Sequence, residues 1–281
     1  MDRLRARQAA FNTASRSEWE SFAEHRQRLT NLLSSEASTA SSRLCVLGAG
    51  NANDIDLPVL LAAHREVHLV DLDTEALARG TERQGVSGHP RLWLHGGVDV
   101  TAMLIFLSDL TPLSRLNPRD IEALAAWPAD RLTSVLPGTF DLVASTCLLS
   151  QILESAAHTL GPNHSQLAEV ELALRAGHLQ LMSGLASPRG RAVLVAEVVS
   201  SRMFPGLLER PTEELVNLLA ELAHQGNHFR GVHPKQLLRA LRADASLGPL
   251  VMEAASLSPW RWRLHDRTYL VSGLSFRVAR G

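Results

Sequence analysis

The sequence contains only two cysteines, Cys45 and Cys147, and one lysine, Lys235, in 281 residues. Both cysteines fall in apolar, strand-like stretches and provide no disulfide framework, so a reducing compartment is expected. No apolar run reaches the roughly 20 residues of a membrane span. The stretch from Met1 to Phe11 lacks the apolar segment of a signal peptide. We therefore expect a cytoplasmic protein without a membrane partner.

An excess of either charge is also missing. The formal net charge is −1, from 28 basic and 29 acidic residues. The basic residues are scattered among acids and form no stripe that could follow a phosphate backbone, so no nucleic-acid partner is expected. With 45% hydrophobic residues, the chain can bury a large core. We expect one enzyme-sized domain with an added helical element.

The stretch from residue 43 to residue 71 predicts a strand, a tight turn, a short helix and a second strand. Residues 43–47 form an apolar run of strand length, and the glycine turn 48–50 interrupts it where a helix would begin. A second apolar run, residues 67–70, ends at Asp71. At the carboxyl end of a parallel strand, this carboxylate can accept hydrogen bonds from two ribose hydroxyls. The stretch therefore predicts a nucleoside site.

Two kinds of nucleoside site have a glycine turn followed by a strand that ends in an acid. A dinucleotide turn has a third glycine that lets helix and strand pack around a pyrophosphate, but Asn53 stands there. The stretch resembles motif I and the acidic motif II of class I S-adenosylmethionine-dependent methyltransferases, whose ligand has a ribose and adenine but no phosphate. The resemblance continues with Asp99-Val100, where the family contacts adenine, and with residues 140–145, which look like motif IV. It departs at Val46, where many members carry an acid.

The resemblance implies an α/β fold: a Rossmann-like, doubly wound, mostly parallel seven-stranded sheet with an antiparallel C-terminal hairpin from residues 260–264 and 269–278. An N-terminal helical cover would precede it. We expect residues 1–42 to form a helical lid and a flexible serine-rich linker, and residues 43–281 to form the methyltransferase-like domain. The activity would be transfer of the sulfonium methyl group of S-adenosylmethionine. An NAD(P)-dependent oxidoreductase and a non-catalytic binding protein of the same fold are the alternatives.

The resemblance implies that the cofactor is bound by residues near the ends of the first four strands. These are Gly48, Ala49, Gly50, Asn53, Asp54, Asp71, Leu72, Asp99, Val100 and Ser145. Polar residues after the fourth strand are where substrates meet an open α/β sheet, so Thr146 and Gln151 are expected to bind the substrate. Trp19 joins them, because the family often covers its pocket with an amphipathic N-terminal helix.

Two residues are candidates to accept a proton from the methyl acceptor. Glu197 is the one carboxylate in an apolar strand at residues 191–199, where an acid is costly unless it is paired or lines a cleft. An ion pair with an arginine is the rival interpretation. His228 could reach the substrate from a loop. Nearby histidines at 224 and 233 suggest a metal, but Gly226 would end the helix and no cysteine or clustered acid completes a ligand set, so none is expected.

The methyl acceptor is expected to be a small molecule. The residues after the fourth strand, Ser145 to Leu148, contain no Asn/Asp-Pro-Pro-Tyr/Phe-like motif, and the chain has no basic face. The acceptor atom and the oligomeric state stay open, because one scaffold hosts oxygen, nitrogen, sulfur and carbon acceptors.

Overall fold

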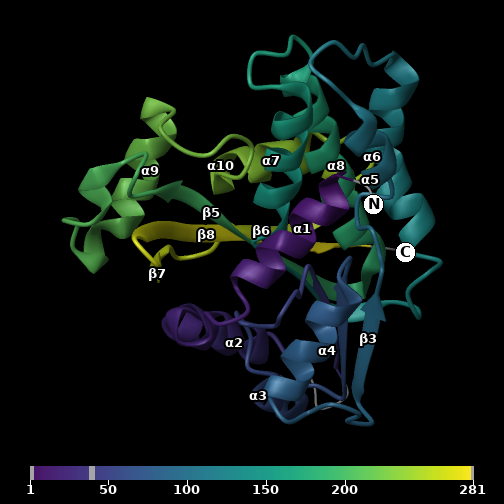
Figure 1. Ribbon diagram of the computed structural model, residues 1–281, viewed down its shortest axis with the longest axis vertical. Coiled ribbons are helices and arrows are strands. Elements are labelled where there is room, and N and C mark those ends of the chain that lie inside the picture. Colours follow the sequence, from purple (N-terminus) through teal and green to yellow (C-terminus); the bar gives the residue numbers. More distant parts are fainter. Residues whose placement is uncertain (1–2, 38–41, 280–281) are drawn as a thin grey trace.

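Five parallel strands form the centre of the computed structural model, which describes residues 3–37 and 42–279 (Figure 1). The sheet has eight strands in the order β3-β2-β1-β4-β5-β8-β6, with β7 pairing to β8. Their bounds are β1 (Arg43–Leu47), β2 (Glu66–Asp71), β3 (Leu92–Gly96), β4 (Phe140–Thr146), β5 (Ala186–Ser200), β6 (Val251–Ser256), β7 (Trp260–Leu264) and β8 (Arg267–Val278). Strands β1 to β5 pair in parallel, and β8 runs antiparallel to β5.

The predicted mostly parallel sheet and its antiparallel hairpin are confirmed. Strands β7 and β8 pair as expected and are joined at His265, whose φ is 54°. The sheet has eight strands where seven were predicted. The additional strand is β6, residues 251–256, which pairs with β8 on the same side as β7 does. The 12-residue β8 is long enough to pair with β6 and β7 in succession.

Helices cover both faces of the sheet (Figure 1). They are α1 (Arg3–Ala14), α2 (Ala23–Ser35), α3 (Leu57–Ala63), α4 (Thr74–Arg83), α5 (Leu104–Asp109), α6 (Pro118–Leu132), α7 (Leu148–Leu160), α8 (Leu167–Leu185), α9 (Leu215–Gln225) and α10 (Pro234–Ala243). Short 3₁₀ turns occur at Glu20–Phe22, Pro205–Leu207, Thr212–Glu214 and Gly248–Leu250. One apolar cluster joins α5, α6, α7, α8 and α10 to the sheet, and another joins α2, α3 and α4.

Helix α6 contains Pro128 in its interior and continues past it to Leu132. A proline inside a helix leaves the carbonyl four residues earlier without its usual donor. That carbonyl belongs to Leu124 and packs against α8 at Gly177, where a Cβ atom would lie only 2.5 Å from the Leu124 oxygen. Close packing between α6 and α8 thus stabilises a helix that the isolated sequence would interrupt.

The N-terminal segment forms two helices with different packing. Helix α2 buries Leu29 and Leu33 in the same apolar cluster as Val46 of β1 and Trp262 of β7, so it belongs to the main core. Helix α1 buries only Leu4. In Figure 1 α1, in purple, lies across the middle of the molecule. Of the predicted cover, α1 is therefore the helix with less burial, and much of the predicted linker falls on residues 38–41, outside the described residues.

Within residues 3–37 and 42–279, no helix has both the length and the apolar character that crossing a membrane requires.

Candidate functional site

The backbone of the turn after β1 lies close to helix α1. Gly48 and Gly50 have φ values of +76° and +48°, which glycine adopts without strain. The Gly48 N–H donates to the Val70 carbonyl of β2, which fixes the turn beside the end of that strand. A Cβ atom on Gly50 would lie 2.8 Å from Oδ1 of Asn12 in α1. The small residues of this turn, including buried Ala49, let another group lie directly on the backbone.

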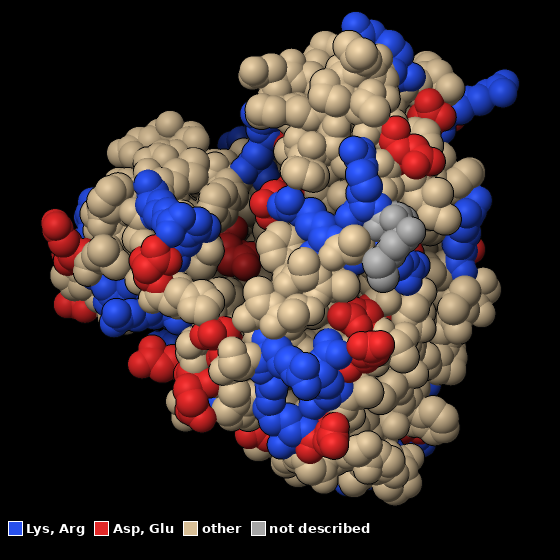
Figure 2. Space-filling model, in the orientation of Figure 1, with Lys and Arg blue, Asp and Glu red and all other residues tan. Residues whose placement is uncertain are grey.

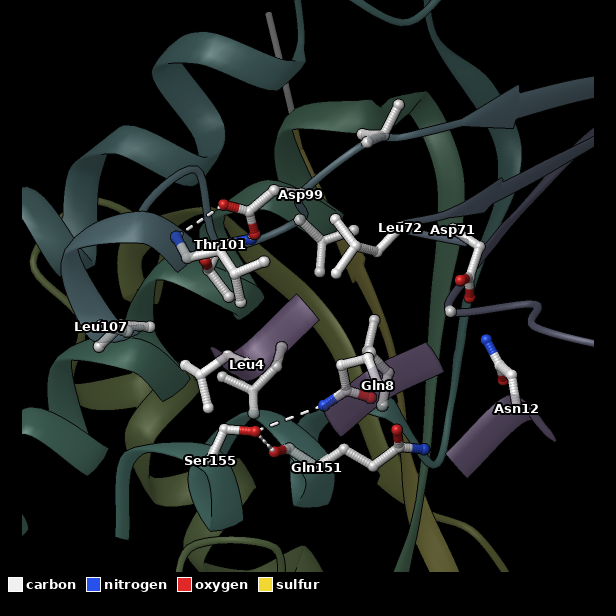
Figure 3. A pocket seen from close by; sticks show the side chains of 16 residues that line it. Leu4, Gln8, Asn12, Asp71, Leu72, Asp99, Thr101, Leu107, Gln151 and Ser155 are labelled. Carbon is white, nitrogen blue, oxygen red and sulfur yellow. Dashed lines mark hydrogen bonds between the residues drawn. The ribbon is translucent and has the colours of Figure 1, made fainter. Parts of the chain in front are cut away.

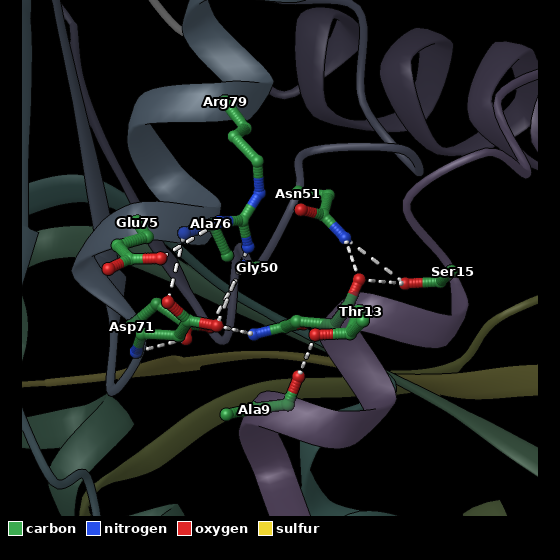
Figure 4. Close-up of polar contacts among 11 residues, drawn as sticks. Ala9, Thr13, Ser15, Gly50, Asn51, Asp71, Glu75, Ala76 and Arg79 are labelled. Carbon is green, nitrogen blue, oxygen red and sulfur yellow. Dashed lines mark hydrogen bonds and ion pairs between the residues drawn. The ribbon is translucent and has the colours of Figure 1, made fainter.

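Asp71 ends β2 next to this turn. Its Oδ2 atom accepts a hydrogen bond from the Gly50 N–H at 2.8 Å, and its Oδ1 atom accepts one from the Asp73 N–H at 2.8 Å (Figure 4). Burial raises the pKa of the Asp71 carboxyl, and these two backbone bonds oppose that shift. An ionised carboxylate has about four acceptor sites, so further donors can still bind to each oxygen.

A cavity extends from Asp71 towards the loop after β3 (Figure 3). It is lined by Leu4, Gln8, Asn12, Gly48, Asp71, Leu72, Val98, Asp99, Val100, Thr101, Leu104, Leu107, Leu148, Gln151, Ile152 and Ser155. Apolar side chains surround its far end, and Asp71 lies at the end nearer the glycine turn. We call it the nucleoside cavity, because a carboxylate at one end and apolar walls at the other suit a ribose and a base.

Asp99 has two roles in the wall of the nucleoside cavity. Its carboxylate accepts hydrogen bonds from the N–H and hydroxyl of Thr101 and from the Leu104 N–H at 2.7 to 2.9 Å. These bonds hold the loop that leads into α5. Asp99 is therefore a turn residue that also lines the cavity together with Val100.

Two further cavities meet the first at Gln151 of α7, which lines all three. We call them together the acceptor cavity. They are lined by residues from the glycine turn, from the ends of β4 and β5, and from β7 and β8. These include Gly48, Ala49, Gly50, Asn53, Asp54, Thr146, Cys147, Gln151, Glu154, Glu197, Trp262, Arg267 and Tyr269. A ligand could therefore extend from the nucleoside cavity across the glycine turn to the ends of β4 and β5.

Asp54 is a buried acid where the acceptor cavity meets the glycine turn. Burial, together with the neighbouring carboxylates Glu197 and Asp71, raises the pKa of its carboxyl to about 6. The nearby Thr146 hydroxyl opposes this shift. That hydroxyl belongs to a side chain only 3% exposed and makes no hydrogen bond of normal geometry. Two buried polar groups therefore face the cavity and are available to a ligand.

Replacing Asp54 by Asn should raise thermal stability at pH 8 and change it little at pH 4. A folded-state pKa above the usual value of about 3.9 means that folding favours the protonated form. The stability from this preference is fully present below about pH 4 and is lost as the pH rises through about 6. The shift corresponds to at most about 3 kcal/mol at pH 8. Thermal unfolding of both proteins at the two pH values measures it.

Asp56→Asn is the matched control, because Asp56 is the N-cap of α3 and accepts a hydrogen bond from the Val59 N–H. Asparagine caps a helix as well as aspartate does, so this variant should show no pH-dependent gain. Equal behaviour of the two variants would contradict the account of Asp54.

Glu197 lies near the carboxyl end of β5 and lines the acceptor cavity. Its Oε2 atom accepts a hydrogen bond of 2.5 Å from the Ser150 hydroxyl. Burial raises the pKa of the Glu197 carboxyl, although its side chain retains some exposure to the cavity, and the Ser150 bond opposes this shift. Among the described residues, no arginine or lysine lies within ion-pair distance of it. The rival interpretation of Glu197 as half of a structural ion pair is not supported.

Cys147 joins β4 to α7 with a φ of 55°, a left-handed conformation that non-glycine residues adopt at a cost. Its side chain is buried in the wall of the acceptor cavity. Burial and the neighbouring Glu197 and Asp54 carboxylates raise the pKa of its thiol well above the usual range. The thiol therefore stays protonated, and Cys147 contributes shape to the cavity and no thiolate nucleophile.

Three predicted site residues lie outside the cavities. Ser145 is fully buried, and its hydroxyl shares a 2.8 Å hydrogen bond with Nε2 of His178 in α8. Because side chains alternate along a strand, Thr146 faces the cavity in its place. The expectation that Ser145 binds the cofactor is therefore wrong.

Trp19 and His228 are the other two. The Arg26 guanidinium stacks 3.5 Å from the centre of the Trp19 ring, and the aromatic residue that reaches the acceptor cavity is Phe22. The His228 ring packs 4.8 Å from His233, and its Nδ1 atom lies 2.9 Å from the Phe229 carbonyl oxygen. Neither ring lines the cavities, so their expected roles in substrate binding and proton transfer are corrected.

The remaining predicted residues lie together at the ends of the strands. Among them, Asn53 already makes hydrogen bonds through both the nitrogen and the oxygen of its side-chain amide. Its Nδ2 donates to the Ser15 carbonyl at 2.7 Å, and its Oδ1 accepts from Arg83 at 2.6 Å. His233 caps α10 by accepting a hydrogen bond from the Lys235 N–H. Across the part of the chain that the structure describes, no group of three or more His, Cys, Asp or Glu residues could hold a metal ion.

Sequence reasoning missed several residues of the cavities. Gln8 and Asn12 lie on α1, whose pattern has too few apolar residues to show which face is inward. Arg267 and Tyr269 lie on β8, 70 or more positions after Glu197 of β5. Tyr269 is the chain's only tyrosine, and its place directly after a predicted hairpin turn was the one available signal.

Comparisons with known proteins give the following results. No protein-family model matches the sequence, and no curated protein matches it. Similar solved structures include the N-methyltransferase NodS from Bradyrhizobium japonicum WM9 in complex with S-adenosyl-L-homocysteine, with 16% identity, a TM-score of 0.43, and coverage of 91% of this chain and 87% of that one. Magnesium protoporphyrin IX methyltransferase from Synechocystis PCC 6803 with bound SAM has 11% identity, a TM-score of 0.44, and coverage of 90% and 78%. An rRNA methylase from Streptococcus thermophilus has 10% identity, a TM-score of 0.40, and coverage of 91% and 97%.

The strand order and direction define the fold more firmly than these distant similarities do. A dinucleotide-binding sheet has the order 3-2-1-4-5-6 with parallel strands. This chain has β3-β2-β1-β4-β5 in parallel, followed by the antiparallel β8. Together with the glycine turn and Asp71, this is the class I methyltransferase fold that the sequence resemblance implied.

Proposed function

We propose that the protein transfers the methyl group of S-adenosylmethionine to a small-molecule acceptor. The observation that carries this proposal is the Asp71 carboxylate, which is fixed beside the glycine turn and faces a cavity with apolar walls (Figure 3). Its oxygens would accept the two ribose hydroxyls. Leu72, Asp99 and Val100 would surround the adenine. S-adenosylmethionine supplies the reactive methyl group, and the protein aligns it with the acceptor and excludes water.

The geometry of α3 argues against a dinucleotide. A pyrophosphate binds at a helix N-terminus that directly follows the glycine turn. Here α3 begins at Leu57, several residues after Gly50, and its N-terminus is capped by the carboxylate of Asp56. An acid at that position repels phosphate. The position of the third glycine in a dinucleotide turn is occupied by Asn53, whose side-chain amide is already hydrogen-bonded to Ser15 and Arg83.

The buried acids of the acceptor cavity favour a cationic cofactor. Val46 replaces the acid that many methyltransferases carry in β1, and it is fully buried in the core. Asp54 has no ion-pair partner among the described residues and lies beside the glycine turn. We assign Asp54 to the methionine ammonium group of the cofactor.

A small-molecule acceptor is consistent with the charges on the surface. Acidic and basic side chains are interspersed on the face shown in Figure 2, and no continuous basic stripe crosses it. A nucleic-acid substrate requires a basic track that follows its phosphates. The acceptor cavity is instead bounded by side chains from α7, β5 and β8.

Calorimetric titration with S-adenosylhomocysteine and with NADH tests the proposal. We expect S-adenosylhomocysteine to bind and NADH to show no measurable binding, because the N-terminus of α3 is occupied by Asp56. Mass spectrometry of nucleosides that copurify with the protein is an independent measurement. If NADH binds and S-adenosylhomocysteine does not, the proposal is wrong and the protein is an oxidoreductase.

A further inference from the structure

The acceptor cavity contains acidic groups that the protein leaves unpaired. Seven acidic or basic side chains line the acceptor cavity: Asp54, Glu154, Glu171, Glu197, Arg230, His265 and Arg267. Glu154 pairs with Arg7 of α1 at 2.8 Å, Glu171 pairs with Arg230 at 3.4 Å, and His265 lies 3.5 Å from Glu18. Among the residues that the structure describes, Asp54, Glu197 and Arg267 have no ion-pair partner within 4 Å. Figure 2 shows a hollow beside the part that carries α9, with acidic atoms at its floor.

Arg267 does not neutralise these acids. Its Nη1 atom donates to the hydroxyl of Tyr269 at 3.4 Å, on β8. Glu197 is held by neutral donors, the Ser150 hydroxyl at 2.5 Å and the thiol of Cys147. A buried carboxylate without a cation is unfavourable unless a ligand supplies the positive charge.

A second feature of the cavity also points to a ligand. The Thr146 side chain is 3% exposed, lines the cavity, and has no hydrogen-bond partner of normal geometry for its hydroxyl. A buried hydroxyl in a native structure is normally paired, so this one has a place for a ligand atom. It lies at the end of β4, where it pairs with Val195 of the neighbouring strand β5, two residues before Glu197.

Aromatic side chains form another wall of the same cavity. The Phe22 and Trp262 rings lie 4.8 Å apart, and the Trp262 and Tyr269 rings lie 5.7 Å apart. All three line the cavity with Glu197. The faces of aromatic rings attract cations, and a carboxylate opposite such faces forms a site for an ammonium group.

We propose that the methyl acceptor is an amine, which binds as an ammonium ion between Glu197 and the aromatic wall. This inference rests on the proposed methyltransferase function and specifies its substrate class. Asp54, next to the glycine turn, serves the cofactor, and Glu197, at the end of β5, serves the acceptor.

The transfer step requires the neutral amine. The ammonium donates a proton to the Glu197 carboxylate, which releases it to solvent through the cavity. The nitrogen lone pair then forms a bond to the methyl carbon as the carbon–sulfur bond breaks, and the bonding electrons stay on sulfur. The positive charge moves from sulfur to nitrogen. The products are the methylated ammonium ion and S-adenosylhomocysteine, and one proton has been released.

Binding of matched amines and alcohols tests the inference without relying on turnover. The probes are benzylamine, 2-phenylethylamine and 3-phenylpropylamine, each compared with the alcohol of the same skeleton. Calorimetry at pH 8 is performed on the full chain with and without S-adenosylhomocysteine. A hydrogen bond to a charged group contributes about 1.5–3 kcal/mol, so we expect at least one amine to bind about tenfold or more tightly than its alcohol.

Glu197→Gln should remove this preference and leave the affinity for S-adenosylhomocysteine within about twofold of the parent. Glu154→Gln is the matched control. It removes a carboxylate from the same cavity, but one that already pairs with Arg7, so the amine preference should persist. The inference is overturned if no amine is preferred over its alcohol, or if the preference survives in Glu197→Gln. A parent protein that prefers amines but does not bind S-adenosylhomocysteine would refute the proposed function and leave the amine site standing.

Discussion

Asp71→Ala is expected to weaken the binding of S-adenosylhomocysteine by roughly 10²-fold or more. The carboxylate is fixed by the Gly50 and Asp73 N–H groups, so its remaining acceptor positions are directed into the nucleoside cavity. Two ribose hydroxyls bonded to a charged acceptor would lose about 1.5–3 kcal/mol each. Calorimetric titration of the parent and the variant measures the change.

The same substitution leaves two backbone donors without their acceptor, so thermal unfolding is measured in parallel. Asp73→Asn is the control, because Asp73 caps α4 by accepting a hydrogen bond from the Ala76 N–H and asparagine can replace it there. Its affinity for S-adenosylhomocysteine should stay close to that of the parent. If Asp71→Ala remains folded and binds S-adenosylhomocysteine as tightly as the parent does, the assignment of Asp71 to the ribose is wrong.

Removal of residues 1–14 should leave a folded protein from which S-adenosylhomocysteine dissociates at least about tenfold faster. Helix α1 supplies Leu4, Gln8 and Asn12 to the nucleoside cavity (Figure 3). It is held by side-chain contacts that include Gln8 to Ser155 at 3.4 Å and Asn12 to Asp73 at 3.1 Å. Since Asn12 lies directly over Gly50, α1 must shift for a ligand to reach the turn. Stopped-flow displacement measures the dissociation rate.

Removal of residues 1–35 should instead prevent folding. Each buried leucine that is lost costs about 2–5 kcal/mol, and α2 carries two, Leu29 and Leu33, against one, Leu4, in α1. Helix α2 also holds His25, which accepts a hydrogen bond from Trp260 at 3.1 Å in the core. The stabilisation that is lost with two leucines and this contact approaches the free energy of unfolding of a whole domain, which is roughly 5–15 kcal/mol. Unchanged dissociation in a folded protein lacking residues 1–14 would show that α1 is not a lid.

The sequence by itself determined the opening half of the sheet. The first strand, the glycine turn, the helix cap at Asp56 and the second strand ending at Asp71 are all signalled within a few residues of one another. Such signals are local: the length of an apolar run, the conformation that glycine permits, and the hydrogen bond from a capping side chain.

Local signals could not determine which side of a buried strand faces the site. Strand β4 is buried along nearly its whole length, so its sequence shows no polar alternation that would tell whether Ser145 or Thr146 faces the cavity. A shift of one residue along a strand reverses the direction of the side chain. The packing of α8, which brings His178 to Ser145, decided that Thr146 faces the cavity.

The tertiary structure alone decided which distant residues share the acceptor cavity. Glu197 and Asp54 are far apart in sequence, and their carboxylates influence each other only because β1 and β5 both flank β4. The position of α1 across the strand ends likewise depends on contacts with α4, α5 and α7 that its own pattern does not encode. The local sequence specifies the individual strands. The electrostatic environment of the site arises only when parallel pairing brings the carboxyl ends of these strands to one edge of the sheet.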